Sequence, residues 1–263
     1  MKKISRIPAI WLAIVYCFLY LPIVMLAVYS FTDATMIGKA GHFSLKNYRT
    51  LFLTPDLRSM IAGTLILALV VGVLSTILGT FGAIGAFYSR KKGRRAIELM
   101  NQVPVVNADV VTGFSVCILL VVVLGVSKDT YIPLVAGQMA LCTPFVYLQV
   151  MPALTQMDPN MYEAALDLYC RPGDAIIKVV LRKLSPSIVS GFFTAVTLSM
   201  DDYFVTTYTK PAVFDTISTY TVNATKGART QIKTALWALS ALIFFIAIAA
   251  VVIANIRNKE EGE

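Results

Sequence analysis

Three acidic residues lie inside long apolar segments of this sequence: Asp109, Asp201 and Asp202. A charged residue at the centre of a membrane span costs about 2.5–3.5 kcal/mol, so the adjacent pair would cost roughly 5–7 kcal/mol if both carboxylates were ionised in lipid. No Lys or Arg in the apolar segments can neutralise them. Because such acids face a bundle interior or a wet pathway and mark routes for cations, we expect a transported cation to supply the missing positive charge.

The two neighbouring aspartates should point in different directions. On a helix with 3.6 residues per turn, adjacent residues lie about 100° apart. Asp201 then falls near one line with Tyr208. Asp202 falls near another line, with Ser199 and Thr206. One aspartate should therefore face the cargo while the other orients a hydroxyl or a partner helix; which one does so is open, and we favour Asp201, beside Tyr208, as the cargo contact.

The predicted substrate pathway comprises Asp109, Ser199, Asp201, Asp202 and Tyr208. We expect Asp109 to serve a different depth from the adjacent pair, because it lies near the start of its own apolar segment. Two alternatives stay open: Asp109 is solvated by lipid headgroups, and the adjacent pair has a purely structural role.

Six apolar segments could hold these residues in membrane-spanning helices, since about 20 residues cross a bilayer at ~1.5 Å per residue. They cover about 9–31, 60–88, 104–126, 131–154, 186–209 and 234–256. With both termini in the cytoplasm, the inner segments hold 14 of the 23 Lys and Arg residues, as the positive-inside rule requires. The prediction is an all-α, multi-pass membrane protein. A cleaved signal peptide is the alternative for the first segment.

The composition excludes several classes of protein. Only 14% of the residues are charged, against about 25% in soluble domains, so we predict one membrane domain over residues 1–263. The net charge of +8 comes from loops beside the spans, and no nucleic acid is expected as a partner. Four scattered cysteines without CxxC spacing predict neither a disulfide framework nor a metal site. The glycine-rich stretch GTFGAIGAF (79–87) lacks a Walker lysine, so the small residues at intervals from Gly72 to Ala86 are predicted to form a stripe for close helix packing.

A polar-rich loop at 163–187 separates two apolar segments. A first short helix is expected over about 161–168, and the Pro-Gly pair at 172–173 should break it. A second, amphipathic helix should cover about 174–184 and stop before Pro186. Its apolar face must pack either against the membrane bundle or against another protein.

This loop resembles the EAA loop in the permeases of binding-protein-dependent ABC importers, since Glu-Ala-Ala (163–165) precedes a helix break and an amphipathic helix. The stretch FSLKNYRTLF (43–52) is similar to the first external loop of that family. LSMDDYFVTTYTKP (198–211) and TISTYTVNATKG (216–227) resemble the spermidine/putrescine branch, in particular its second permease subunit.

The resemblance implies the type I ABC importer permease fold, with the EAA loop at about 155–185 on the cytoplasmic side. In that family the loop docks on a cytoplasmic ATPase and transmits its motion to the spans. The residues implied in this coupling are Glu163, Ala164, Ala165, Asp167 and Gly173. Two positions depart from the usual pattern: Tyr169-Cys170 stands where Gly-Ala is usual, and Leu181-Arg182 where Leu-Pro is usual.

The resemblance also implies a set of partners in a bacterial plasma membrane. They are a second homologous permease subunit, an ABC ATPase dimer, an extracytoplasmic polyamine-binding protein and the lipid bilayer. ATP and Mg would be bound by the ATPase, with no cofactor or catalytic residue on this chain. Polyamines are polycations with apolar spacers, which suits separated acids with aromatic walls. A permease for another solute and a proton-coupled secondary carrier are the alternatives, whereas a membrane-embedded enzyme lacks a nucleophile motif or a His cluster.

Overall fold

The computed structural model describes residues 6–33, 41–158, 160–226, 235–242 and 244–245. Its regular structure is helical in these ranges, apart from an isolated antiparallel bridge between Thr32 and Phe43. The chain divides into two compact units, one formed by residues 1–59 and 221–263 and the other by residues 60–220. The two units are described separately.

The first unit contains the N-terminal apolar helix and a short outer helix. Helix α1 covers Arg6–Ser30, and α2 covers Lys46–Leu53. The buried Asn47 amide donates to the carbonyls of Ser30 at 3.1 Å and Thr32 at 2.8 Å. Because both carbonyls lie at or just beyond the end of α1, this side chain satisfies orphan acceptors there. It fixes α2 against the end of α1.

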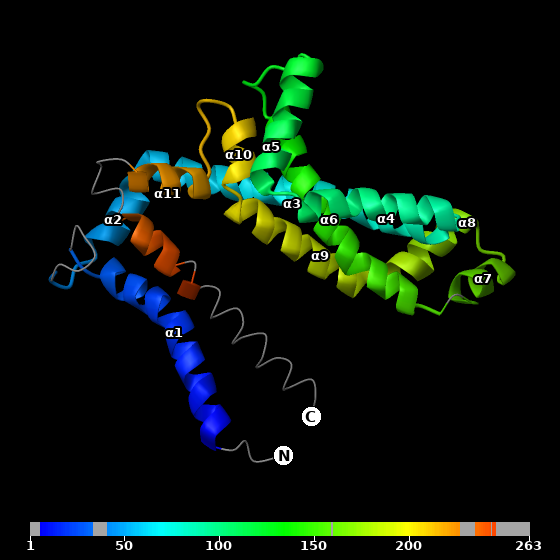
Figure 1. The fold of residues 1–263 in the computed structure, drawn as a ribbon, viewed down its shortest axis with the longest axis horizontal. Helices are drawn as coiled ribbons and strands as arrows, with labels where there is room; N and C mark the ends of the chain where they lie inside the picture. The colour runs from blue at the N-terminus through cyan, green and yellow to red at the C-terminus, as the bar shows by residue number, and fades with distance from the viewer. Residues whose placement is uncertain (1–5, 34–40, 159, 227–234, 243, 246–263) are drawn as a thin grey trace. The chain divides into compact units, whose positions relative to one another are not determined.

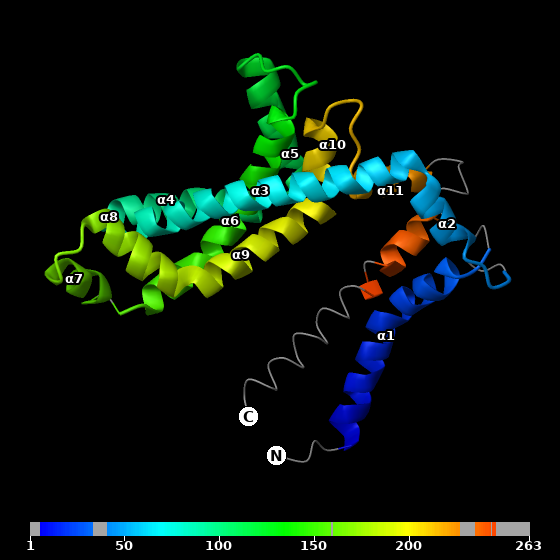
Figure 2. The same cartoon turned by 180° about the vertical axis from the view of Figure 1, so that it is seen from behind.

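In the second unit, three long helices pack side by side: α3 (Pro55–Tyr88), α6 (Ile132–Gln156) and α9 (Leu181–Asp201). Figures 1 and 2 show this group with α7 (Asn160–Asp167) and α8 (Pro172–Ala175) at one end. The core between the helices is made of fully buried aliphatic side chains, among them Val71, Val146, Val150, Leu184 and Ala195.

The glycine stripe on α3 allows close approach at two positions. A Cβ atom added at Gly72 would lie 2.6 Å from a methyl of Val196, and one at Gly79 would lie 2.7 Å from Val146 Cβ. The packing prediction is therefore confirmed at these two glycines. At Gly82 a Cβ would meet no atom within 4 Å.

The predicted span 104–126 is not one helix. Helix α4 covers Lys91–Val106, and after a bend of 108° the chain continues as α5 (Asp109–Cys117) and the π-helical η1 (Ile118–Val123). Asn107 and Ala108 are extended, with ψ near 149° and 138°. The expected start of the span at Pro104 was therefore wrong.

The predicted stop before Pro186 was also wrong. Residues Pro172–Asp201 form one continuous helix of 30 residues through α8, the π-helical η2 (Ile176–Val180) and α9. A proline inside a helix costs about 3 kcal/mol. Val180 and Leu184 are both fully buried beside it, and each contributes roughly 1.5–3 kcal/mol by that burial. Tertiary packing outweighs the local signal.

Three helices are long and apolar enough to cross a membrane: Pro55–Tyr88, Ile132–Gln156 and Pro172–Asp201. The bent pair α4 and α5–η1 makes a fourth if it is one broken span. Of the six predicted spans, the first corresponds to α1, and most of 234–256 falls outside the described residues. The all-α prediction is confirmed, whereas the count of six is not.

Candidate functional site

The predicted span 186–209 is interrupted at the acidic pair. Helix α9 ends at Asp201, and a separate short helix, α10, covers Phe204–Thr209. The Asp202 carboxylate accepts hydrogen bonds from the backbone N–H groups of Val205 at 3.1 Å and Thr206 at 2.7 Å. These N–H groups belong to the first turn of α10 and have no partner inside that helix. The side chain of Asp202 thus caps α10 as it begins.

A buried polar network links this cap to α6. The Thr206 hydroxyl donates to Asp202 Oδ2 at 2.6 Å and accepts a hydrogen bond from Gln138 Nε2 at 2.8 Å. The Ser199 hydroxyl donates to Gln138 Oε1 at 2.5 Å. Asp202 is 8% exposed, and the other three side chains are fully buried. The four residues therefore form one satisfied network that joins α9, α10 and α6.

Two glycines allow α10 to pack closely against α5 and α6. A Cβ atom at Gly113 of α5 would lie 2.7 Å from Val205 Cα, and one at Gly137 of α6 would lie 2.9 Å from a Val205 methyl and 3.1 Å from a Thr209 methyl. Helices α5 and α10 accordingly lie side by side (Figures 1 and 2). The position of α10 is set by backbone contact as well as by the cap.

The predicted pathway residues separate into two groups. Ser199 and Asp202 are brought together and are engaged by protein partners. Asp201 and Asp109 are exposed, and Asp109 lies within electrostatic range of Asp202. Because Gly113 of α5 lies against Val205 of α10, the bend before α5 brings Asp109 towards the start of α10, whereas the depth of Asp109 in the membrane stays a prediction.

Tyr208 is half-buried on α10, and its ring makes an edge-on contact with Phe114 of α5 at 5.8 Å between centroids. The predicted common line of Asp201 and Tyr208 assumed a continuous helix. Because the helix breaks after Asp201, that alignment is wrong.

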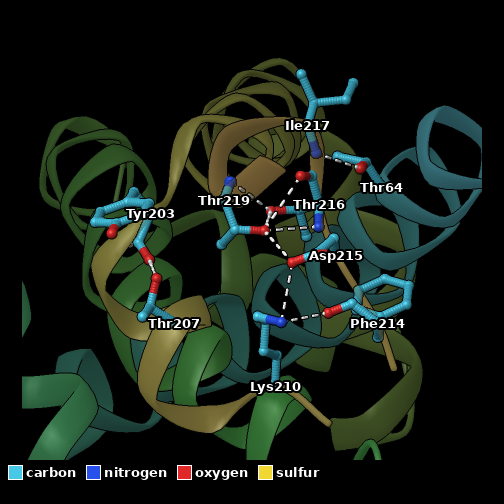
Figure 3. Close-up of polar contacts among 9 residues, drawn as sticks. All are labelled: Thr64, Tyr203, Thr207, Lys210, Phe214, Asp215, Thr216, Ile217 and Thr219. Atoms are coloured by element: carbon cyan, nitrogen blue, oxygen red, sulfur yellow. Dashed lines mark hydrogen bonds and ion pairs between the residues drawn. The ribbon is translucent and has the colours of Figure 1, made fainter. Parts of the chain in front are cut away.

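A second polar cluster follows α10 and was not predicted. The Lys210 ammonium lies 2.9 Å from Asp215 Oδ1 and donates to the carbonyl of Phe214 at 2.8 Å (Figure 3). The Thr219 hydroxyl lies 3.2 Å from the same carboxylate oxygen. Nearby, the hydroxyl of Thr64 on α3 accepts the N–H of Ile217 at 3.0 Å. The only sequence signal was a lysine directly after an apolar segment with an aspartate five residues later.

Gln138 was also not predicted, although an amide side chain inside an apolar segment is itself a signal. A buried polar group without a partner costs about 1–3 kcal/mol. Such a residue in a predicted span therefore indicates a hydrogen-bonded neighbour on another helix.

The first helix of the EAA loop is confirmed: α7 covers Asn160–Asp167, and the adjacent Pro159 lies outside the described residues. Of the predicted coupling residues, Glu163, Ala164, Asp167 and Gly173 are exposed, whereas Ala165 is buried. Four of the five are thus free to contact a partner.

The break after α7 lies earlier than predicted. Tyr169 has φ 59°, the left-handed region, and its N–H donates to Leu166 O at 2.9 Å. The Cys170 N–H donates to Ala165 O at 3.1 Å, which completes a Schellman motif. Pro172 instead begins α8, in keeping with its preference for the first helical position. The prediction that Pro172 and Gly173 break the helix was wrong.

Comparisons with known proteins agree with this architecture. A family model described as "Binding-protein-dependent transport system inner membrane component" matches residues 75–258. The Escherichia coli K12 putrescine transport system permease protein PotI is 28% identical over 198 residues, covering 73% of this chain and 70% of its own. The spermidine/putrescine transport system permease protein PotC of Haemophilus influenzae is 27% identical over 250 residues, 95% of each chain.

A solved structure has the same fold. It is the crystal structure of a bacterial ABC transporter involved in the import of the acidic polysaccharide alginate, with a TM-score of 0.74 at 19% identity, covering 96% of this chain and 94% of that one. The family model alone spans more than half of the chain. The chain therefore belongs to the family of binding-protein-dependent transport system inner membrane components, the permease subunits of ABC importers.

Proposed function

We propose that this permease moves spermidine or putrescine into the cytoplasm by alternating access. The observation that carries the proposal is the set of uncompensated acids beside α10. Among the described residues, no ion pair involves Asp109, Asp201 or Asp202. Acids held in a predominantly apolar bundle without a partner cation suit a cargo that brings its own positive charge. Permeases named for spermidine and putrescine are among the relatives.

The two exposed acids are assigned to the cargo. Asp201 and Asp109 are open to solvent in this chain, whereas Asp202 already accepts three hydrogen bonds. Asp202 and Ser199 therefore act as positioning residues that hold α10. Tyr208 and its neighbour Phe114 supply an aromatic surface for cation–π contact with an ammonium group.

An anionic cargo fits this arrangement poorly. Like charges repel, so an acidic polysaccharide of the kind imported by the structural neighbour would meet Asp109 and Asp201 at a cost in free energy. Several modest acidic sites instead bind a polycation weakly enough for release.

The exposed side of α7 is assigned to the ATPase, with Glu163 as its central charge. A ring contact of 5.4 Å between Tyr88 and Tyr162 holds the end of α3 against α7. The basic cluster SRKKGRR (89–95) follows Tyr88 directly, so it lies at the same end as the loop. This supports a cytoplasmic position for both, and the distribution of Lys and Arg along the sequence supports the same side for the N- and C-termini. The ATPase would bind ATP and Mg, a second permease would complete the pathway, and an extracytoplasmic binding protein would deliver the cargo.

Uptake into vesicles tests the cargo. The complex is reconstituted with its ATPase, second permease and binding protein, and labelled spermidine and putrescine are supplied with and without ATP. We expect ATP-dependent uptake that falls about threefold to fivefold in Asp201→Asn, because an ion pair with an acid exposed to solvent is worth up to about 1 kcal/mol. Unchanged uptake in both Asp201→Asn and Asp109→Asn would overturn the charge assignment. Uptake driven by a proton gradient without ATP would instead indicate a secondary carrier.

Glu163→Lys tests the coupling surface. Charge reversal at an exposed position should leave folding within about 0.5 kcal/mol of the wild type while it lowers both co-purification of the ATPase and ATP-driven uptake. If ATPase association and uptake both survive, α7 does not transmit the motion.

A further inference from the structure

The ammonium group of Lys210 is held as a ligand would be. It lies 2.9 Å from the Asp215 carboxylate and 2.8 Å from the Phe214 carbonyl (Figure 3). An ammonium has three donors and no acceptor, and these two acceptors satisfy two of the three. We call this set of acceptors, with the Thr219 hydroxyl that contacts the same carboxylate oxygen, the ammonium site.

We propose that the ammonium site is a binding site for one ammonium group of the cargo, and that Lys210 is its built-in substitute when no cargo is present. This proposal rests on the function proposed above. The side chain of lysine is a chain of four methylenes that ends in an ammonium group. A linear polyamine has the same terminal unit, so its ammonium and methylenes can take the place of those of Lys210.

The exposure of the two partners permits this exchange. The Lys210 side chain is 15% exposed and that of Asp215 is 40% exposed. Asp215 can therefore be reached from solvent while it is still paired with Lys210. An ion pair this exposed lowers the affinity of a competing ligand by about fivefold at most. A dissolved amine can therefore displace Lys210 from Asp215.

Aromatic rings beside the site favour an alkylammonium over a metal cation. The Phe214 ring makes an edge-on contact with Tyr131 at 5.4 Å between centroids, and the carbonyl of the same residue binds the ammonium. Apolar ring surface can cover the methylenes of a polyamine, and a ring face attracts its charge. A hydrated inorganic ion gains neither contact.

The loop is anchored independently of Lys210. The backbone N–H of Thr216 donates to Thr219 Oγ1 at 2.9 Å, and the N–H of Ile217 donates to Thr64 of α3 at 3.0 Å. Loss of the lysine therefore leaves the acceptors in place. Exchange also keeps one positive charge on Asp215, so the carboxylate is not left unpaired as the cargo moves on towards Asp201.

The site lies where an incoming cargo would arrive. Lys210 follows α10 directly, and its six helical residues span about 9 Å at 1.5 Å per residue. Asp202 and Asp109 are at the other end of this helix. In the proposed orientation the loop after α10 faces outward, so the ammonium site would precede the acids along the route.

The test compares Lys210→Met with Asp215→Asn in the reconstituted complex. Lys210→Met removes the competing ammonium and should lower the KM for polyamine uptake by about threefold to fivefold. Asp215→Asn removes the acceptor and should raise it by a similar factor. Lys210→Arg, which keeps a competing cation, should not lower the KM. If Lys210→Met and Asp215→Asn shift the KM in the same direction, the pair is a structural latch and the proposal fails.

A second measurement separates this proposal from the proposed function. The melting temperature of the purified complex is followed in n-butylammonium chloride against equal sodium chloride. A larger butylammonium-specific rise in Lys210→Met than in the wild type, absent in the double variant with Asp215→Asn, supports the ammonium site even if the wild type transports no polyamine. No difference between the variants overturns the site whatever the wild type transports.

Discussion

Two breaks between helices in the second unit are built in opposite ways. At Asp202 the capping side chain is buried, and its carboxylate satisfies the N–H groups of the helix that follows. At Tyr169 the break is on the surface, and the backbone satisfies the carbonyls of the preceding helix by turning into the left-handed region. Tyr169 itself is 97% exposed.

The two breaks differ because water can reach the backbone at one of them and not at the other. A buried helix end cannot use water, so each N–H or C=O group needs a protein partner. Inside the bundle, hydrogen bonds join Asp202 to Thr206, Gln138 and Ser199 in one network. At the exposed break only the backbone is used, and the side chain of Tyr169 stays available to a partner. The inner break should therefore be sensitive to side-chain chemistry, and the outer one to backbone conformation.

The largest effect is expected at the inner break. Asp202→Ala removes the acceptor of three buried hydrogen bonds, and each buried group left without a partner costs about 1–3 kcal/mol. We expect a loss of roughly 3 kcal/mol or more in the free energy of unfolding, measured in detergent or lipid by denaturant titration.

Its matched control is the neighbouring acid. Asp201→Ala at an exposed position should change stability by no more than about 0.5 kcal/mol, although uptake falls. Equal stability losses in the two variants would contradict the division between a positioning acid and a cargo acid.

The next largest effect is expected where α10 packs against α5. Gly113→Ala places a Cβ atom 2.7 Å from Val205 Cα, a clash with backbone that side-chain rotation cannot relieve. We expect a loss of about 1–3 kcal/mol, measured by the same denaturant titration. Gly82→Ala, with open space around the new methyl, should be neutral or gain up to about 1 kcal/mol from helix propensity. If Gly113→Ala is as harmless as Gly82→Ala, α10 is not held by close contact with α5.

Much of the helical architecture could be predicted from the sequence, because apolar length and helix-starting residues are local. The segment of α6 and the short helix α7 were predicted close to their observed limits. The grouping of Ser199, Asp202 and Thr206 was also predicted, and the structure brings the three together. It does so around a helix break instead of along one line.

The breaks themselves were missed because tertiary packing decides between competing local signals. Pro186 is a helix stop that buried neighbours override, whereas Asp202 is a helix-start residue inside an apolar run that looked like one continuous span. The break at Asp202 is stabilised by Gln138 and Gly113, which contact α10 but are distant in sequence and lie on other helices.

The smallest effect is expected at the outer break. A residue with a side chain in the left-handed region costs about 1–2 kcal/mol relative to glycine, and the Tyr169 side chain is too exposed to recover this by packing. Tyr169→Gly should therefore stabilise the turn by about 1 kcal/mol, seen as slower hydrogen exchange at the Tyr169 and Cys170 amides. Tyr169→Ala, which keeps the Cβ atom, should not slow exchange. If the glycine variant also weakens ATPase association while the turn becomes more stable, the exposed tyrosine ring contributes to docking. If it leaves association unchanged, the ring is dispensable there.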